Sequence, residues 1–327
     1  MKHPMVLANA IIAGTNKAGT TSLFRYLSDH PEVCASNIKE ISFFSGLQGE
    51  LTPQALSRYA SHFAHCPPEA RIRLEASANY LTGGARVARL IRECLPEVRL
   101  IFILREPVSR LLSNYRRTKE RLHEKVSNVS PDDYIKSLLS AAERRDGSGP
   151  YNPFTMELKS VSYADLLSQY LAEFASDQIK ILFYDDLARN ALEFAKSACA
   201  FLGIDPSFYD SYQFHVENKT RTYRSKRLQR FAHYIYMRSE RWLNRIPALR
   251  RRLRDVYNLV NEERNAATAS APEGSKQLRA YFADHNRALG ELLRRTYPAT
   301  RLPEWIPDSS VSAVSTRQPF EQAGEWS

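Results

Sequence analysis

The feature that most constrains the fold is a short apolar run that leads into a polar loop near the amino terminus. The run spans residues 10–14, and the loop over residues 14–22 reads GTNKAGTTS. Apolar side chains then recur at helical spacing over residues 23–27, so the pattern predicts a strand, a loop and a helix in succession. Such a loop directs backbone N–H groups and the positive end of the helix at one place. We therefore expect an anion-binding site, to which Lys17 and the loop hydroxyls add donors.

The position of Lys17 distinguishes this loop from a Walker A loop. A Walker A loop has glycine directly before the lysine and Ser or Thr directly after it, whereas Lys17 precedes Gly19 by two positions. An ATP-dependent P-loop-like kinase remains an alternative, supported only by Asp185 and Asp186 behind a later apolar run. Taken alone, the loop also allows a solvated Lys17 and a Thr20 that merely caps the helix.

Further apolar runs predict strands at residues 71–75, 99–104 and 178–184. The last two runs are almost continuously apolar, which is typical of strands buried on both faces. Strands that alternate with helices predict an α/β fold with a mostly parallel sheet flanked by helices. The helical patterns that fill the intervals span residues 54–63, 85–93, 108–121, 162–174 and 188–202.

A second polar motif follows the strand expected at residues 99–104. Arg105 comes directly after that strand, so we expect it at the carboxyl edge of the sheet, where open α/β folds bind ligands. Pro107 suits the first turn of the next helix, and Ser113 would lie about two turns further along it. Both side chains are therefore expected on the same side of the sheet as the loop.

Together the two motifs resemble those of the sulfotransferases that use 3′-phosphoadenosine 5′-phosphosulfate (PAPS), above all the bacterial and heparan-type carbohydrate sulfotransferases. The resemblance implies a P-loop-like sulfotransferase fold, with PAPS as co-substrate and no metal ion. It assigns the 3′-phosphate to Arg105 and Ser113. It assigns the 5′-phosphosulfate to the loop residues Lys17, Ala18, Gly19, Thr20, Thr21 and Ser22.

The segment KEISFF at residues 39–44 extends the resemblance to the catalytic base. It is similar to a family segment in which the glutamate is taken as the base, which implies that Glu40 accepts the acceptor's proton while Lys17 stabilises the leaving group. Pairing of Glu40 with Lys39 or an arginine at the surface is the alternative. Phe43 and Phe44 are expected in the core.

The segment EASANYL at residues 75–81 resembles another family segment. Glu75 and Ser77 would orient the acceptor or Lys17, or would only cap the strand end. Ala76 departs from the pattern, because the heparan-type enzymes have a helper lysine at that position. Similarity continues to a C-terminal segment at residues 284–293, so the resemblance covers nearly the whole chain.

A further departure concerns the last nucleotide contact. The cysteine pair that closes a hairpin in the heparan-type enzymes is missing, and TYRSKRL at residues 222–228 stands in its place. This segment looks like the R-S-x-R-L segment of bacterial members, which implies that Arg224 contacts the nucleotide.

Positive charge is concentrated in one part of the chain. The net charge is +10, and residues 224–254 contain eleven basic side chains against one acidic side chain. Apolar residues recur among the arginines at helical spacing, which predicts one or two amphipathic helices. We expect this segment to attract an anionic acceptor, such as a glycan, or to contact an anionic membrane surface. A basic nucleic-acid-binding protein is the non-enzymatic alternative, but no recognised motif accompanies the charge, so no specific nucleic acid is expected as partner.

The four cysteines, at positions 34, 66, 94 and 199, are far apart and form no CxxC pair. This spacing favours buried free thiols in a reducing compartment over metal ligands, and it predicts a cytoplasmic protein. Lys2 and the apolar residues after it imitate a signal peptide, but cleavage after Ala10 would cut into the first strand, so we expect no leader.

The length of 327 residues allows one large domain or two smaller ones. The motifs predict a single sulfotransferase domain over residues 1–307 and a flexible tail over residues 308–327. Variable loops at residues 45–53 and 119–154 are expected to form the acceptor pocket.

Overall fold

The computed structural model describes residues 5–67, 69–121, 129–144, 152–214 and 272–307. Within these residues the strands form one sheet in the order β2-β3-β1-β4-β5, and every strand pair is parallel. The strands are β1 (Ala10–Gly14), β2 (Val33–Ala35), β3 (Ile72–Ala76), β4 (Arg99–Leu104) and β5 (Ile179–Phe183).

The helices lie between the strands and follow the last of them. Those before β5 are α1 (Thr20–Ser28), α2 (Phe43–Gly46), α3 (Pro53–Ala60), α4 (Gly84–Cys94), α5 (Pro107–Arg121), α6 (Pro131–Glu143), α7 (Pro153–Lys159) and α8 (Tyr163–Leu171). Those after it are α9 (Tyr184–Arg189), α10 (Ala191–Leu202), α13 (Ser275–Tyr281) and α14 (Ala283–Thr296). Short 3-10 turns are η1 (Ser61–Phe63), η2 (Leu81–Gly83), η3 (Ser176–Gln178) and η4 (Pro206–Ser211).

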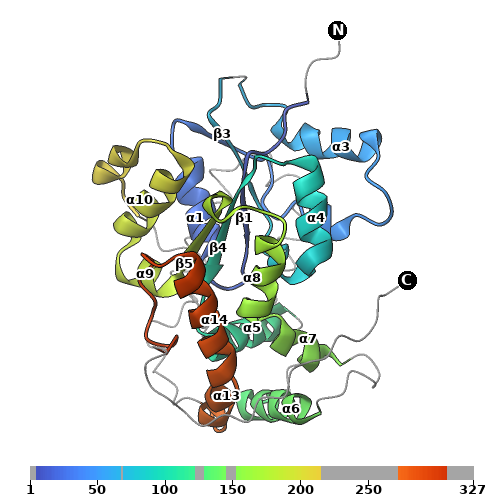
Figure 1. Cartoon of the computed structure of the whole chain (residues 1–327), viewed down its shortest axis with the longest axis vertical. Helices are drawn as coiled ribbons and strands as arrows, with labels where there is room; N and C mark the ends of the chain where they lie inside the picture. The colour runs from blue at the N-terminus through green and yellow to red at the C-terminus, as the bar shows by residue number, and fades with distance from the viewer. Residues whose placement is uncertain (1–4, 68, 122–128, 145–151, 215–271, 308–327) are drawn as a thin grey trace, which may run out of the picture. The chain divides into compact units, whose positions relative to one another are not determined.

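Alternate residues of the central strands enter two different cores, because side chains along a strand point to opposite faces. Ala10 and Ile12 of β1 pack with α1 and α10 on one face. Ile11 and Ala13 pack with α4 and α8 on the other face. Figure 1 shows the sheet between these two pairs of helices. The predicted α/β fold, a mostly parallel sheet with helices on both faces, is therefore confirmed.

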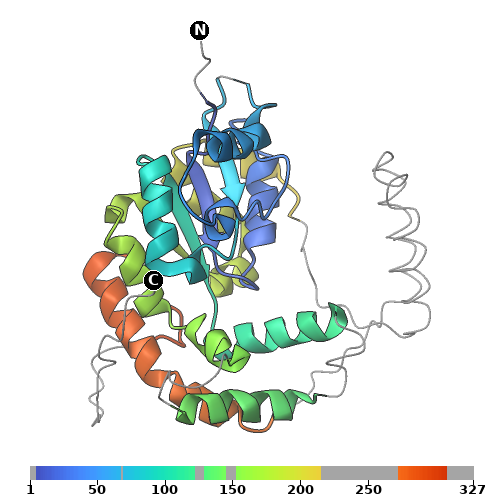
Figure 2. The ribbon, with the colours of Figure 1, turned by 90° about the vertical axis from the view of Figure 1, so that its right-hand side faces the viewer.

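The carboxyl ends of β1, β3 and β4 lie side by side. Ile12 of β1 pairs with Ala76 of β3 and with Ile101 of β4 in parallel register. The segments that leave these three strands therefore start at the same edge of the sheet. Helices α5, α6, α7 and α13 gather beyond the sheet, in the lower part of both ribbon views (Figures 1 and 2).

The predicted helices and strands are present in the structure, which also contains elements that were not predicted, among them β2, α2, α6, α7 and α13. The short edge strand β2 was not predicted, since three residues give little periodicity. The helix expected over residues 188–202 is interrupted at Asn190, whose side chain accepts the N–H groups of Leu192 and Glu193 and caps α10. The segment 119–154, expected as a loop, contains α6, which begins with a capping box between Ser130 and Asp133.

The expectation of four free thiols was wrong for two of the cysteines. Cys34 in β2 and Cys66 after η1 form a disulfide, and Cys94 and Cys199 are free. The pair escaped detection because its members are 32 positions apart and meet only when β2 docks beside β3. The prediction of a reducing, cytoplasmic setting loses the support it took from unpaired cysteines. The bond joins the two ends of the segment that carries Glu40.

We expect that replacing both Cys34 and Cys66 with serine lowers the free energy of unfolding by about 2–4 kcal/mol, because the disulfide restricts the unfolded chain. Urea denaturation of the two proteins measures this difference. Cys94→Ser is the matched control, since it removes a partly buried thiol that forms no disulfide. A double variant as stable as the control would contradict the bond.

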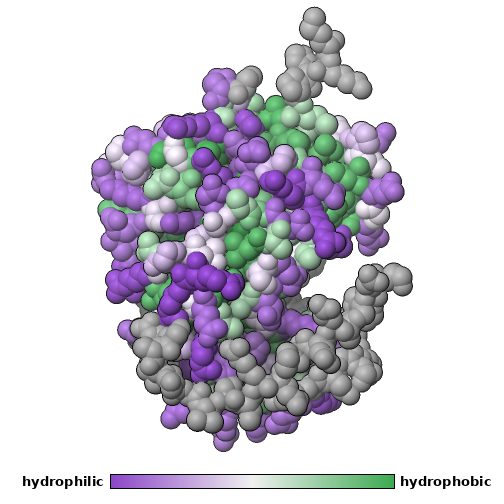
Figure 3. All heavy atoms as spheres, viewed as in Figure 1, coloured by the Kyte–Doolittle hydropathy of each residue, from purple (hydrophilic) through white to green (hydrophobic). Residues whose placement is uncertain are grey.

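No helix among the described residues is long and apolar enough to cross a membrane. Polar and apolar side chains are interspersed on the face shown in Figure 3. The predictions for Arg224, for amphipathic helices over residues 224–254 and for a tail over residues 308–327 lie outside the described residues.

Candidate functional site

The loop between β1 and α1 has the backbone of an anion site. Gly19 precedes the first turn of α1 with φ of +92°, a conformation that favours glycine. A Cβ atom at Gly19 would lie 2.4 Å from Leu187 Cδ2, so the close approach of α9 also requires glycine. The helix that follows has no acidic residue in its first turn. The N–H groups at the start of α1 can therefore bind an anion without competition from a carboxylate.

Hydroxyl groups around this loop are buried. Thr20 and Ser22 are in the first turn of α1 and are 5% and 6% exposed. Thr15 is fully buried, and its hydroxyl has no hydrogen-bond partner among the described residues. A buried hydroxyl without a partner is costly unless a ligand or water supplies one. The orphaned Thr15 hydroxyl and the glycine at position 19 fit a phosphate-type group bound at this loop.

Two arginines, one just before α5 and one in its first turn, hold the loop by its carbonyl groups. Arg105 Nη1 donates to the Lys17 carbonyl at 2.9 Å, and Arg110 Nε donates to the Asn16 carbonyl at 3.0 Å. Arg110 is 3% exposed and also donates to Ser160 Oγ at 2.7 Å. Arg110 was not predicted from the sequence. The sequence does contain a signal for a buried role of this residue, because an arginine stands on the apolar face of the helix between Val108 and Leu111.

Arg105 still has donors available for an anion. Its guanidinium lies 4.2 Å from the centre of the Tyr184 ring and forms no salt bridge within the described part of the chain. Burial lowers the pKa of Arg105, which reflects a positive charge held partly out of water. Ser113 lies further along α5 and is 8% exposed. The structure thus brings Arg105 to the loop, as predicted, and places Ser113 in α5, the helix that follows Arg105.

Glu40 lies at the carboxyl end of β3, the neighbour of β1. Its backbone N–H donates to the Ala76 carbonyl at 2.7 Å, and its Oε2 accepts the N–H of Ala78 at 2.9 Å. Its other oxygen contacts the ammonium group of Lys39. The alternative pairing with Lys39 is therefore present, yet the Glu40 side chain remains 41% exposed and can still meet a substrate. Ala76, at the position of the helper lysine in the heparan-type enzymes, is buried. The ammonium group beside Glu40 is instead that of Lys39.

Unfavourable backbone conformations mark the same places. Among the described residues, Lys17, Glu40 and Ser42 are those other than glycine with positive φ, at 67°, 64° and 55°. Such conformations persist where surrounding contacts enforce them, and they cluster at functional sites. Two of the three are the residues predicted to be catalytic.

Glu75 does not face the site. It is fully buried in β3 and accepts hydrogen bonds from the hydroxyls of Tyr59, Ser77 and Tyr80 at 2.6, 2.7 and 2.7 Å. Burial raises the pKa of the Glu75 carboxyl, and the three hydroxyl donors oppose that rise. The Glu75 carboxyl is therefore enclosed by these hydroxyls, and its expected roles, to orient the acceptor or Lys17 or to cap the strand end, stay predictions. Phe44 is fully buried, as expected.

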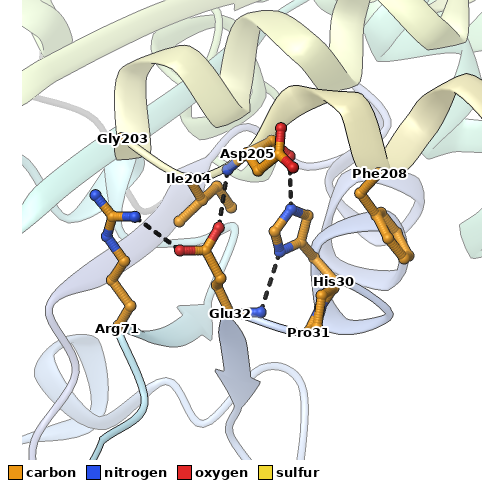
Figure 4. Close-up of a pocket in the computed structure, with 8 residues that line it drawn as sticks. All are labelled: His30, Pro31, Glu32, Arg71, Gly203, Ile204, Asp205 and Phe208. Atoms are coloured by element: carbon orange, nitrogen blue, oxygen red, sulfur yellow. Dashed lines mark hydrogen bonds and ion pairs between the residues drawn. The ribbon is translucent and has the colours of Figure 1, made fainter.

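A cavity of about 570 Å³ lies at the other edge of the sheet, where β2 and β3 begin (Figure 4). Its polar groups bond to one another: Arg71 pairs with Glu32 at 2.7 Å, and Glu32 also accepts the N–H of Asp205 at 2.8 Å. These contacts hold the pKa of Glu32 below its usual range. His30 bonds to the Asp205 carbonyl and to the Glu32 N–H. We assign no ligand to this cavity, because its polar groups satisfy each other.

One group of side chains within the described residues is close enough to share a metal ion, namely Cys34, His65 and Cys66. Its two sulfur atoms are joined in the disulfide. The group lies at the edge strand β2, and sequence spacing did not reveal it because the residues meet only in the fold.

The loop, the arginine beside it and the carboxylate next to the end of β3 form a polar site at the carboxyl edge of the parallel sheet, the edge where open α/β folds bind ligands. The chain belongs to the sulfotransferase domain family, whose model matches residues 7–254. The match includes the loop, Glu40, Arg105 and Ser113. The resemblance drawn from the motifs is therefore confirmed at the level of the family.

The curated relatives that the chain matches are also named as sulfotransferases. The chain is 24% identical over 320 residues to a bifunctional heparan sulfate N-deacetylase/N-sulfotransferase of Drosophila melanogaster, which covers 92% of this chain and 27% of the relative. It is 34% identical over 113 residues to the membrane-associated sulfotransferase kil1 of Dictyostelium discoideum, covering 34% of this chain and 23% of the relative. It is 25% identical to heparan sulfate glucosamine 3-O-sulfotransferase 3A1 of Mus musculus, covering 65% of this chain and 50% of the relative. The matches thus cover half or less of each relative's length.

Among solved structures, a sulfotransferase from Alicyclobacillus acidocaldarius has the same fold. The two superpose with a TM-score of 0.51 at 24% identity, over 74% of this chain and 96% of the other.

Proposed function

We propose that this protein transfers the sulfuryl group of PAPS to a hydroxyl or amine of a glycan acceptor. The observation that carries the proposal is the placement of Lys17 and Glu40 at the ends of adjacent strands β1 and β3, each in an unfavourable backbone conformation. One position suits a cation at the leaving group, and the other suits a base at the nucleophile. Family membership supports the same reaction.

The residues of the loop, together with Arg105 and α5 behind it, would hold the donor. The N–H groups and hydroxyls of Thr20, Thr21 and Ser22 would bind the phosphosulfate end, and Arg105 with Ser113 would bind the 3′-phosphate. Bound PAPS supplies an activated sulfuryl group, so the chain itself has to provide position, charge and a base. The orphaned Thr15 hydroxyl is a further donor at the same loop.

Glu40 would accept the proton of the acceptor as the acceptor atom bonds to sulfur. The bond between sulfur and the phosphate oxygen breaks, and the ammonium of Lys17 offsets the charge that develops on that oxygen. The products are the sulfated acceptor and adenosine 3′,5′-bisphosphate. The N–H of Ala78 holds one oxygen of the Glu40 carboxylate, and the ammonium of Lys39 contacts the other.

A glycan acceptor is supported by the relatives named for heparan sulfate chemistry. The basic segment at residues 224–254 adds attraction for an anionic chain. An ATP-dependent kinase is less well supported, because the loop has no glycine directly before Lys17.

Calorimetric titration with adenosine 3′,5′-bisphosphate, ATP and duplex DNA tests the proposal. We expect saturable binding of the bisphosphate, weaker binding of ATP and no sequence-specific DNA complex. Incubation with ³⁵S-labelled PAPS and desulfated heparan sulfate oligosaccharides then tests transfer. Preference for ATP over the bisphosphate would overturn the proposal in favour of a kinase.

Arg105→Ala should reduce the preference of the protein for adenosine 3′,5′-bisphosphate over adenosine 5′-phosphate by about 10–100-fold. Hydrogen bonds to a charged group contribute about 1.5–3 kcal/mol, and this variant removes those to the 3′-phosphate. The ratio of the two affinities is the informative quantity. Arg105 also supports the Lys17 carbonyl, and damage to the loop weakens both ligands alike. An unchanged ratio would show that Arg105 does not recognise the 3′-phosphate.

A further inference from the structure

The buried carboxyl group of Glu75 has no part in the proposed reaction, yet it lies directly beside the segment that carries Glu40. Glu75 precedes Ala76, whose carbonyl accepts the Glu40 N–H. Within the described residues Glu75 forms no salt bridge, and its hydrogen-bond donors are three hydroxyl groups. Burying a carboxylate without a cation beside it costs desolvation free energy, so such an arrangement needs an explanation.

Two of the three hydroxyls connect Glu75 to the backbone of the Glu40 segment. Ser77 donates to Glu75 Oε1, and its oxygen accepts the N–H of Ser42 at 2.8 Å. Tyr80 donates to the same Oε1, and its oxygen accepts the N–H of Phe44 at 3.4 Å. We call these two groups the relay hydroxyls. Each hydroxyl donates its hydrogen bond to the carboxylate, so that a lone pair of the hydroxyl oxygen faces a backbone N–H.

The Tyr59 hydroxyl differs in one respect. It donates to the other oxygen of Glu75, Oε2, at 2.6 Å, but it accepts no hydrogen bond from the Glu40 segment. Its ring stacks on Phe43 with 4.9 Å between centres. Tyr59 therefore shares the burial and the carboxylate of the relay hydroxyls without holding the backbone that follows Glu40.

The backbone held by the relay hydroxyls is the strained part of the site. Glu40 and Ser42 both have positive φ, at 64° and 55°, and Ser42 leads into α2. Residues other than glycine rarely adopt this backbone conformation, so the contacts at Ser42 and Phe44 have to maintain it.

We propose that Glu75 is a positioning residue for Glu40, acting through the relay hydroxyls of Ser77 and Tyr80 on the backbone N–H groups of Ser42 and Phe44. This inference rests on the proposed function, in which Glu40 is the base. Glu75 itself touches neither donor nor acceptor. Its effect is to keep the Glu40 carboxylate where the acceptor's proton can reach it.

Three single variants separate positioning from general stabilisation. Ser77→Ala and Tyr80→Phe each remove one relay hydroxyl, and Tyr59→Phe is the matched control that removes the third donor and keeps its ring. All three should lose stability in urea denaturation, because each takes a hydrogen bond from the same buried carboxyl. We expect kcat with ³⁵S-labelled PAPS and desulfated heparan sulfate oligosaccharides to fall about 10–100-fold in the relay variants only. Affinity for adenosine 3′,5′-bisphosphate should stay unchanged in all three.

Hydrogen exchange provides a readout that does not depend on activity. Peptides that contain Ser42 and Phe44 should exchange faster in Ser77→Ala and Tyr80→Phe than in Tyr59→Phe. Glu75→Gln should keep most of the activity, because its carbonyl oxygen still accepts from both relay hydroxyls while its amide donates to Tyr59. Glu75→Leu removes the acceptor of both relay hydroxyls, so the protein that does fold should have lost activity.

The outcomes distinguish the two proposals. If the parent transfers sulfate and the relay variants lose no more kcat than Tyr59→Phe, the positioning role is overturned and the proposed function stands. If the exchange rates of the segment are the same in all three variants, the positioning role is likewise overturned. If the parent transfers no sulfate from PAPS to the oligosaccharides while it fails to bind adenosine 3′,5′-bisphosphate, the proposed function itself is overturned.

Discussion

Lys17→Ala is expected to lower kcat about 10²–10³-fold while affinity for adenosine 3′,5′-bisphosphate changes little. Removing one group that stabilises charge in a transition state typically costs this much. The effect should fall on kcat, because the leaving oxygen gains its charge only as the bond to sulfur breaks. Single-turnover transfer from labelled PAPS and calorimetric titration with the bisphosphate measure the two quantities.

The backbone at Lys17 allows a sharper version of this experiment. Lys17 has φ of +67°, a conformation that costs an alanine about as much as a lysine but suits glycine. Lys17→Ala and Lys17→Gly therefore remove the same ammonium group with different backbone consequences. Equal loss of kcat in both assigns the effect to the ammonium group. Lys136→Ala on α6 is the control for an exposed lysine away from the loop. A turnover number unchanged in Lys17→Ala would remove this residue from the mechanism.

The parts of the site that could be predicted from the sequence are those whose residues are contiguous. The loop from Gly14 to Ser22 contains its own strand end, glycine and helix start, so its geometry follows from local rules. Arg105 could be placed because it follows a strand that is apolar almost throughout. Glu40 was different. Its assignment came from the resemblance, because no local rule says that residue 40 returns to the end of β3.

The parts that could not be predicted depend on contacts between distant residues. The disulfide needs β2 to pair with β3, and a strand of three residues gives almost no periodic signal. The Glu75 network takes donors from positions 59, 77 and 80, whose meeting is decided by packing. The break at Asn190 did have a local signal, since Asn followed three positions later by Glu is typical of a helix start.

Glu40→Gln should lower kcat about 10²–10⁴-fold and leave binding of adenosine 3′,5′-bisphosphate intact. A single general base contributes about that factor, and an amide cannot accept the proton. The substitution is conservative in every other respect. The Gln carbonyl oxygen can still accept the N–H of Ala78, and the cost of positive φ is similar for both side chains.

Lys39→Met distinguishes a Glu40 that acts as the base from a Glu40 that only forms a surface ion pair with Lys39. The ammonium of Lys39 contacts the Glu40 carboxylate, so either substitution breaks the pair. A pair this exposed contributes about 0.2–1 kcal/mol to stability, and its loss alone would affect both variants alike. If Glu40 is the base, Lys39→Met keeps the proton acceptor and should retain most of the kcat that Glu40→Gln loses. Equal, small losses in the two variants would make Glu40 a structural partner of Lys39. The search for a base would then move to the histidines, because Glu75 is fully buried and cannot reach an acceptor.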